Sequence, residues 1–190
     1  MDESVDVFIG LNFRPFFTKC KPVYSVLIYK NGKLHLQSVG ILENKEEITA
    51  VCKKFNTKVF AFNVHYLEKL GKYKLPKLRL NMYIEELKGF IAYNNRRRKR
   101  SFAIYSQSIY GNGNIPSGEL LMGLNFRFKK LDKYISDLDI NPLKLDWKAH
   151  PVDILDAIAT SLGLYFYYTG SYKKTHLRDI EVILPTKNEG

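Results

Sequence analysis

The chain is poor in cysteine and has no long apolar run. Its 190 residues include two cysteines, Cys20 and Cys52, which are too few for a disulfide framework and do not have the spacing of a zinc site. No segment has the ~20 consecutive apolar residues that a membrane-spanning helix needs, and no N-terminal signal-peptide pattern is present. We therefore expect reduced thiols, a cytoplasmic location and no membrane partner. Two glutamines beside abundant lysine suit a thermophile.

Acidic residues are scarce in residues 53–100, although they balance the basic residues elsewhere. This segment has fourteen Lys and Arg against three Asp and Glu, a difference equal to the net charge of +11 of the whole chain. Because this basic block is confined to one segment, it creates a directional positive field that suits a polyanion such as DNA or RNA. The alternative interpretation is a solvated surface that keeps the protein soluble.

Phosphate contacts are expected from the cations of this block. The candidates are Lys69, Lys72, Lys74, Lys77, Arg79, Arg96, Arg97, Arg98, Lys99 and Arg100. Tyr66, Tyr73 and Tyr83 are interleaved with them, as in grooves where exposed bases stack on aromatic rings. Tyrosines in such positions are equally typical of half-buried packing.

The apolar runs predict one mixed α/β domain over residues 1–190. Strands are expected at residues 5–12, 23–29, 34–39 and 58–64. Asn31-Gly32 indicates a hairpin between the second and third strands, and Asn44 with Glu47 indicates the start of a helix before the fourth. This order favours a three-strand antiparallel meander plus parallel strands, flanked by helices, with the first and fourth strands adjacent.

The second half predicts further helices and strands around a basic connector at about residues 65–100. Helices are expected over 81–93, 117–138 and 151–168, and strands over 101–108 and 179–184. The last of these strands is expected at an edge of the sheet.

Two aspartates in the helix over 151–168 are candidate catalytic residues. Asp153 and Asp156 are three residues apart, so they project from the same side of the helix, with an apolar stripe that includes Ile158 opposite. Paired carboxylates beside a sheet can hold Mg²⁺ against a phosphate. Asp153 has a structural alternative, because a carboxylate in the first turn complements the helix macrodipole. Asp156 lies deeper in the helix.

The first and fourth strands end in Asn12 and Asn63. Since these strands are expected to be parallel neighbours, their ends bring the two side chains to the same edge of the sheet. An amide oxygen can bind Mg²⁺ but adds no negative charge, so weak or absent metal binding is expected. Asn also commonly ends strands by bonding to nearby backbone.

Four segments carry a resemblance to a known family: Phe8–Asn12, Val59–Asn63, His150–Ala157 and Ile180–Pro185. Together they are similar to the RNase-H-like superfamily, and within its RuvC-type Holliday-junction-resolvase branch to a family of uncharacterised predicted nucleases. The resemblance implies acids at the first-strand, fourth-strand and helix positions, which bind two Mg²⁺ ions that activate water and stabilise the scissile phosphate. This chain has Asn12 and Asn63 at the two strand positions, which implies a degenerate active site.

The favoured function is therefore nucleic-acid binding by a catalytically degenerate nuclease without a tightly bound cofactor. One alternative is an active nuclease in which Asp153 and Asp156 bind Mg²⁺ or Mn²⁺. In that case a softer metal ion such as Mn²⁺ or Zn²⁺ could also be coordinated by His65 and His150, although histidines more often have a structural role than a metal-binding one. A third interpretation is a non-catalytic scaffold whose basic surface meets an acidic protein partner.

Overall fold

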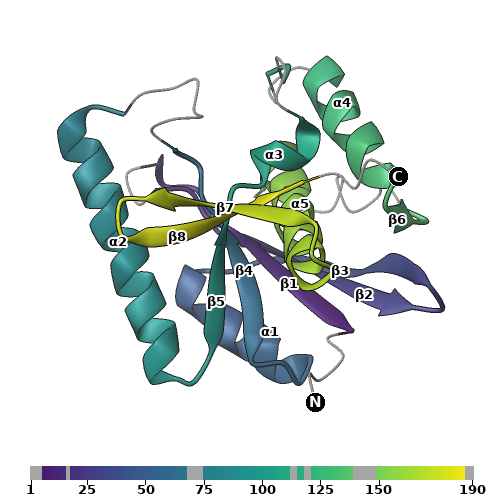
Figure 1. Cartoon of the computed structure of the whole chain (residues 1–190), viewed down its shortest axis with the longest axis horizontal. Helices are drawn as coiled ribbons and strands as arrows, with labels where there is room; N and C mark the ends of the chain where they lie inside the picture. Colours follow the sequence, from purple (N-terminus) through teal and green to yellow (C-terminus); the bar gives the residue numbers. More distant parts are fainter. Residues whose placement is uncertain are drawn as a thin grey trace.

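The computed structural model describes residues 6–15, 18–67, 75–111, 115–117, 121–138 and 149–186. These residues form one mixed sheet with the strand order β6-β3-β2-β1-β4-β5-β8-β7 (Figure 1). The strands are β1 Val7–Asn12, β2 Val23–Lys30, β3 Lys33–Ile41, β4 Val59–Asn63, β5 Arg100–Ile104, β6 Ile135–Ser136, β7 Tyr172–Leu177 and β8 Ile180–Pro185. The helices are η2 Lys45–Glu47, α1 Ile48–Lys54, α2 Lys77–Arg96, α3 Gln107–Tyr110, α4 Leu121–Asp132 and α5 Pro151–Tyr168. No described helix is long and apolar enough to cross a bilayer.

The centre of the sheet has the predicted topology. β1 pairs antiparallel with β2 and parallel with β4, and β2 pairs antiparallel with β3. The hairpin between β2 and β3 turns at Asn31 and Gly32, both with positive φ, which is the backbone that a tight two-residue turn needs. The predicted meander and the adjacent first and fourth strands are confirmed.

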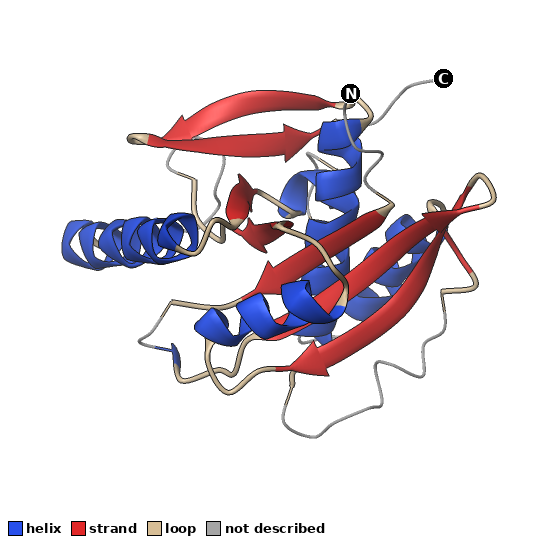
Figure 2. Ribbon diagram, turned by 90° about the horizontal axis from the view of Figure 1, so that it is seen from below, coloured by secondary structure: helices blue, strands red, loops and turns tan. Residues whose placement is uncertain are grey.

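Helices cover both faces of the sheet (Figure 2), and β1 contributes to both interfaces. Phe8 packs into the cluster formed with α3, α4 and α5, whereas Ile9 and Leu11 pack into the cluster formed with α1 and α2. This separation follows from the alternation of side chains along a strand. Asn12 has the same parity as Phe8, so it faces α5.

Gly10 lets α5 approach β1 closely on that face. A Cβ atom at residue 10 would lie 2.4 Å from the Ser161 backbone nitrogen and 2.5 Å from the Ala157 carbonyl oxygen. The hydroxyls of Ser25 and Ser161 also form a buried hydrogen bond between β2 and α5. The absence of a side chain at Gly10 thus fixes the height of α5 above the sheet, and with it the position of the two aspartates beside Asn12.

Three predicted elements needed correction. The helix predicted over 117–138 is too long, because α4 ends at Asp132 and Ile135–Ser136 pair with β3 as β6. The strand predicted at 101–108 ends at Ile104, and α3 follows. The strand predicted at the edge is β8, which lies between β5 and β7. The edge strand β7 escaped prediction because four of its six residues are polar, from Lys173 to His176, and its sequence contains no apolar run.

The helix predicted over 81–93 is also longer in the structure, extending over Lys77–Arg96 as α2. The interval assigned to a basic connector is therefore largely helical, apart from residues 68–74, which lie outside the described residues. The predicted single apolar stripe on α5 is a further correction. Its residues are buried almost all round from Val152 to Leu164, because α3 and α4 pack against it as well as the sheet.

Candidate functional site

A chain of buried hydrogen bonds joins the strand ends to α5. Ser106 Oγ donates to Asn63 Oδ1 at 2.8 Å, and Asn63 Nδ2 donates to Asn12 Oδ1 at 2.9 Å. Asn12 Nδ2 then donates to Asp153 Oδ1 at 3.0 Å. All four residues are less than 5% exposed. The structure thus brings together Asn12, Asn63 and Asp153, and each amide acts as both donor and acceptor, which a carboxylate cannot do.

Asp153 also has a cationic partner, Arg14, which follows β1. Arg14 Nε donates to Asp153 Oδ1 at 2.8 Å. Burial acts to lower the pKa of Arg14, but the charge of Asp153 and this hydrogen bond outweigh it and raise the pKa. The carboxylate is nearly inaccessible, with 5% of its side chain exposed against 35% for Arg14. Charge-assisted bonds of this kind are about twice as strong as neutral ones.

Asp156, one turn further along α5, is held by side chains from α3 and α4. It accepts hydrogen bonds from Tyr110 Oη at 3.1 Å and from Gln107 Nε2 at 3.3 Å. Arg127 Nε lies 4.0 Å from Asp156 Oδ1, and Arg127 Nη1 donates to the carbonyl of Pro116 at 2.9 Å. Burial raises the pKa of Asp156 to about 6, against the opposing effect of the Arg127 charge.

The two histidines have structural partners. His65 Nε2 lies 3.0 Å from the carbonyl oxygen of Phe13, which can only accept, so this nitrogen carries the proton. Burial lowers the pKa of His65 to about 4, which keeps the ring neutral at pH 7. His150 Nδ1 accepts from the backbone N–H of Val152 as the N-cap of α5. Within the described ranges, no group of three or more His, Cys, Asp or Glu is placed to hold a metal ion.

These donors do not fit the two Mg²⁺ ions that the resemblance implies. The oxygens of Asn12 and Asn63 are neutral and already accept hydrogen bonds. Asp153 faces Arg14, and Asp156 faces Arg127, so each carboxylate has a positive side chain beside it. Mg²⁺ gives up its water reluctantly and depends on anionic oxygens in a nearly ideal octahedron. The site is a neutralised polar cluster.

The basic residues divide between the two ends of α2. Lys77 and Arg79 lie in its first turn, while Arg96 lies in its last, about 30 Å away for a helix of 20 residues. The register of β4 with β5 pairs Val59 with Arg100 at one end and Asn63 with Ile104 at the other. The basic residues around Arg100 therefore lie at the opposite end of the sheet from the polar cluster (Figure 1).

The cations near the end of α2 differ in their surroundings. Arg96, Arg97 and Arg98 are exposed, and the Arg97 guanidinium lies 3.6 Å from the ring centre of Tyr93. Lys99 is partly buried and its Nζ donates to the Thr57 carbonyl at 2.9 Å. Arg100 is also exposed, and its guanidinium lies 4.7 Å from the ring centre of Phe102. Lys69, Lys72 and Lys74 lie outside the described residues.

Tyr83 does not form the base-stacking surface that its position among the lysines suggested. Its ring is fully buried, and its hydroxyl accepts from the backbone N–H of His65 at 3.1 Å. Tyr66 packs against it edge to face, with ring centres 5.5 Å apart. Both tyrosines belong to the α2 interface. The packing interpretation is correct for Tyr83, and Tyr73 lies outside the described residues.

The site residues that sequence reasoning missed are Arg14, Ser106, Gln107, Tyr110 and Arg127. Arg14 is two residues beyond Asn12, and this closeness was an available signal. Ser106, Gln107 and Tyr110 follow β5 directly, which the overlong predicted strand concealed. Arg127 gave no signal, since a single arginine on a helix is normally a surface residue, whereas here it is 7% exposed.

No family model matches the chain, and no curated protein matches it by sequence. Among solved structures, it is similar to Thermus thermophilus RuvC in complex with a Holliday junction substrate, with a TM-score of 0.53 and 9% identity over 86% of this chain and 96% of that one. A second T. thermophilus RuvC structure gives a TM-score of 0.50 and 10% identity, with the same coverage of 86% and 96%. The yeast mitochondrial Holliday junction resolvase Ydc2 gives 0.48 and 12%, over 81% of this chain and 75% of that one. At such identities the likeness concerns the fold: the chain has the RNase-H-like fold of RuvC.

Proposed function

We propose that this protein binds nucleic acid and that its former nuclease site no longer catalyses hydrolysis. The observation that carries the proposal is the pairing of each helix carboxylate with an arginine, Asp153 with Arg14 and Asp156 with Arg127. Two arginines balance the charge of two carboxylates in a region from which water is largely excluded. A divalent ion would have to displace Arg14 from its charge-assisted bond to Asp153 and would find only neutral amide oxygens at the two strand positions.

The nucleic-acid part of the proposal rests on charge and on the structural likeness. The basic block over residues 53–100 carries a charge equal to the net charge of the whole chain. Three of its exposed arginines, Arg96, Arg97 and Arg98, form one consecutive run at the end of α2. The fold is shared with a RuvC that was solved together with a Holliday junction. Exposed guanidinium groups contact phosphates without reading sequence, so broad specificity is expected.

The binding test replaces Arg96, Arg97 and Arg98 together with Ala. A matched control replaces Lys173, Lys174 and Arg178, in β7 and the turn after it, with Ala. These three residues are also exposed, so their replacement removes the same charge from another part of the surface. Affinity for labelled single-stranded, duplex and branched DNA and RNA is measured at several salt concentrations. We expect the first variant to bind all ligands more weakly and to lower the slope of log affinity against log salt by up to about 3, roughly one for each phosphate that an arginine no longer neutralises. Equal behaviour of the two variants would refute the assignment to these arginines.

The catalytic part is tested on the same ligands with Mg²⁺ or Mn²⁺. We expect complexes without cleavage products, because neither ion has an adequate set of anionic ligands. Cleavage by the unaltered protein that disappears in Asp156→Ala would instead make it a working nuclease. Protein that neither binds nor cleaves would shift the proposal to an acidic protein partner.

A further inference from the structure

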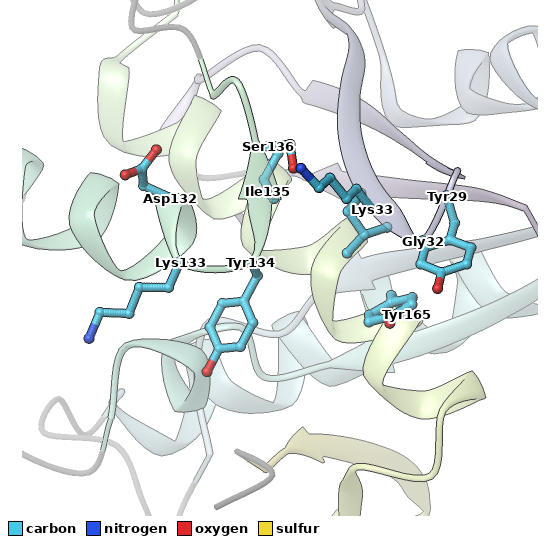
Figure 3. A pocket seen from close by; sticks show the side chains of 10 residues that line it. Tyr29, Gly32, Lys33, Asp132, Lys133, Tyr134, Ile135, Ser136 and Tyr165 are labelled. Atoms are coloured by element: carbon cyan, nitrogen blue, oxygen red, sulfur yellow. The ribbon is translucent and has the colours of Figure 1, made fainter. Parts of the chain in front are cut away.

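A pocket of about 330 Å³ opens on a part of the molecule that the proposed function does not use. It lies between the β2–β3 turn, the short strand β6 and the C-terminal end of α5 (Figure 3). Tyr165 in its wall is twelve residues beyond Asp153 on the same helix, so the pocket is about 18 Å along α5 from the carboxylates. It is therefore distinct from the polar cluster.

Three tyrosines form the walls of this pocket. The rings of Tyr29 and Tyr165 are stacked, with centres 5.8 Å apart and planes inclined by 27°. Tyr29 is 38% exposed, so part of its ring remains open to a ligand. Tyr134 is held edge to face by Phe166 at 5.2 Å. Since packing already fixes the rings, the protein side chains would lose little conformational freedom when a planar ligand binds.

The floor of the pocket is apolar and rigid. Leu34 and Ile135 line it and are 3% and 1% exposed. They are cross-strand partners in the parallel pairing of β3 with β6, which sets their position from the backbone. Gly32, at φ 76° in the hairpin turn, lines the opening without a side chain to fill it.

The rim of the pocket is cationic. Lys33 follows the hairpin turn and its ammonium group lies near Ser136, whereas Lys133, on the α4 side, points away from Tyr29 and Tyr165 (Figure 3). Both are exposed, and Asp132 is the one acidic residue among the described lining residues. Lysine is a common ligand of phosphate because its ammonium group carries three donors and a full charge. The rim thus favours an anion attached to whatever fills the aromatic interior.

We propose that this pocket binds a nucleotide, with its base against Tyr29 and Tyr165 and its phosphate at Lys33. The volume lies at the lower end of the range for small-ligand sites. Aromatic faces beside cations are the combination by which proteins bind unstacked bases. A free nucleotide and an unpaired nucleotide of a strand carry the same chemistry. The inference goes beyond the proposed function, since it names a second site.

The test uses the whole chain with two kinds of probe. One is a set of nucleoside monophosphates measured by calorimetry, and the other is a short single strand containing 2-aminopurine, whose fluorescence falls when it stacks on tyrosine. Tyr29→Leu removes a wall, and Lys33→Gln removes a charge of the rim. The matched controls are Tyr168→Leu, at the end of α5, where the tyrosine is exposed to nearly the same fraction as Tyr29, and Lys30→Gln, the cross-strand partner of Lys33 that does not line the pocket.

We expect Tyr29→Leu to weaken binding roughly 5- to 100-fold, the usual range for the loss of one stacked base. Lys33→Gln should weaken it less and reduce its salt dependence, and both controls should bind as the unaltered protein does. Binding of monophosphates supports the free nucleotide as ligand, and binding of the strand alone supports the strand. Absence of both, or equal losses in the controls, overturns the inference. Strand binding that depends on Arg96 to Arg98 but not on Tyr29 overturns it while leaving the proposed function intact.

Discussion

Replacing Asn12 with Asp should destabilise the protein, because it turns a hydrogen-bond donor into a second buried carboxylate. In the structure, Asn12 is 1% exposed and its Nδ2 donates to Asp153 Oδ1 at 3.0 Å. In the variant, an oxygen would take the place of Nδ2 and face the Asp153 carboxylate with no proton between them. Asn63 would still donate to the other oxygen of residue 12, so only one side of the chain of hydrogen bonds is broken.

The magnitude follows from two effects. A lost hydrogen bond to a charged group costs about 1.5–3 kcal/mol, and an uncompensated buried charge costs about 3–5 kcal/mol. The effects overlap, and a proton taken up between the two carboxyls limits both, so we expect the free energy of unfolding to fall by about 3 kcal/mol at pH 8. For a chain of this size, each kcal/mol shifts Tm by roughly 2–4 °C. The expected decrease in Tm is therefore roughly 6–12 °C.

Thermal unfolding followed by circular dichroism in EDTA measures this decrease. The loss should shrink at pH 5, because a proton between the new carboxyl and Asp153 restores a hydrogen bond. Asn95→Asp is the matched control, since Asn95 is exposed on α2, and it should leave Tm nearly unchanged. An Asn12→Asp variant as stable as the unaltered protein at pH 8 would refute the reasoning. So would a rise in the Tm of the unaltered protein on addition of Mg²⁺, because only a ligand of the folded state stabilises it.

Two further predictions concern buried groups and packing. Because the pKa of Asp156 is raised to about 6, the folded state binds an extra proton between about pH 4 and 6, and this group's contribution to stability falls as pH rises through that window. The pKa of His65, lowered to about 4, acts in the opposite direction, so its contribution rises between about pH 4 and 6.5. Urea unfolding across pH 4–7 should therefore show a steeper rise of stability with pH in Asp156→Asn and a shallower one in His65→Gln; unchanged slopes would contradict both assignments. Gly10→Ala should lower stability by about 3 kcal/mol, since its methyl group would meet the backbone of α5. Gly89→Ala, on the exposed side of α2 with open space around it, should instead stabilise by about 0.5–1 kcal/mol, and equal effects would contradict the packing argument.

The central topology could be predicted from the sequence because local signals agree with the fold. Asn31-Gly32 specifies a turn that only a hairpin uses, and the apolar runs of β1, β2 and β4 are long enough to be buried strands. The meeting of Asn12, Asn63 and Asp153 followed from one topological inference, the parallel pairing of β1 with β4. Because of this pairing, Asn12 and Asn63 at the two strand ends lie at the same edge of the sheet, and α5 covers that edge.

The arginine partners could not be predicted, because their contacts are long-range. Arg14 and Asp153 are 139 residues apart in the chain, and Arg14 lies in an irregular segment whose direction no periodicity indicates. Arg127 reaches Asp156 because α4 packs beside α5, and the sequence gives no local signal for the contact between these two helices. Charge counting had a similar limit. It located the basic block but could not show that α2 places Lys77 and Arg79 at one of its ends and Arg96 at the other.

The amides and the arginines of the site compensate for one another. With acids at residues 12 and 63, the cluster would need divalent cations to be stable in a buried place, since like charges a few ångströms apart repel strongly. With Asn12 and Asn63, two negative charges remain, and Arg14 and Arg127 each place a positive charge beside one of them. The hydrogen bonds from Asn63 to Asn12 and from Asn12 to Asp153 also require amide donors. The two amides and the two arginines are therefore complementary parts of one buried polar cluster, in which amide donors and guanidinium charges take the places that metal ions would need to fill among four carboxylates.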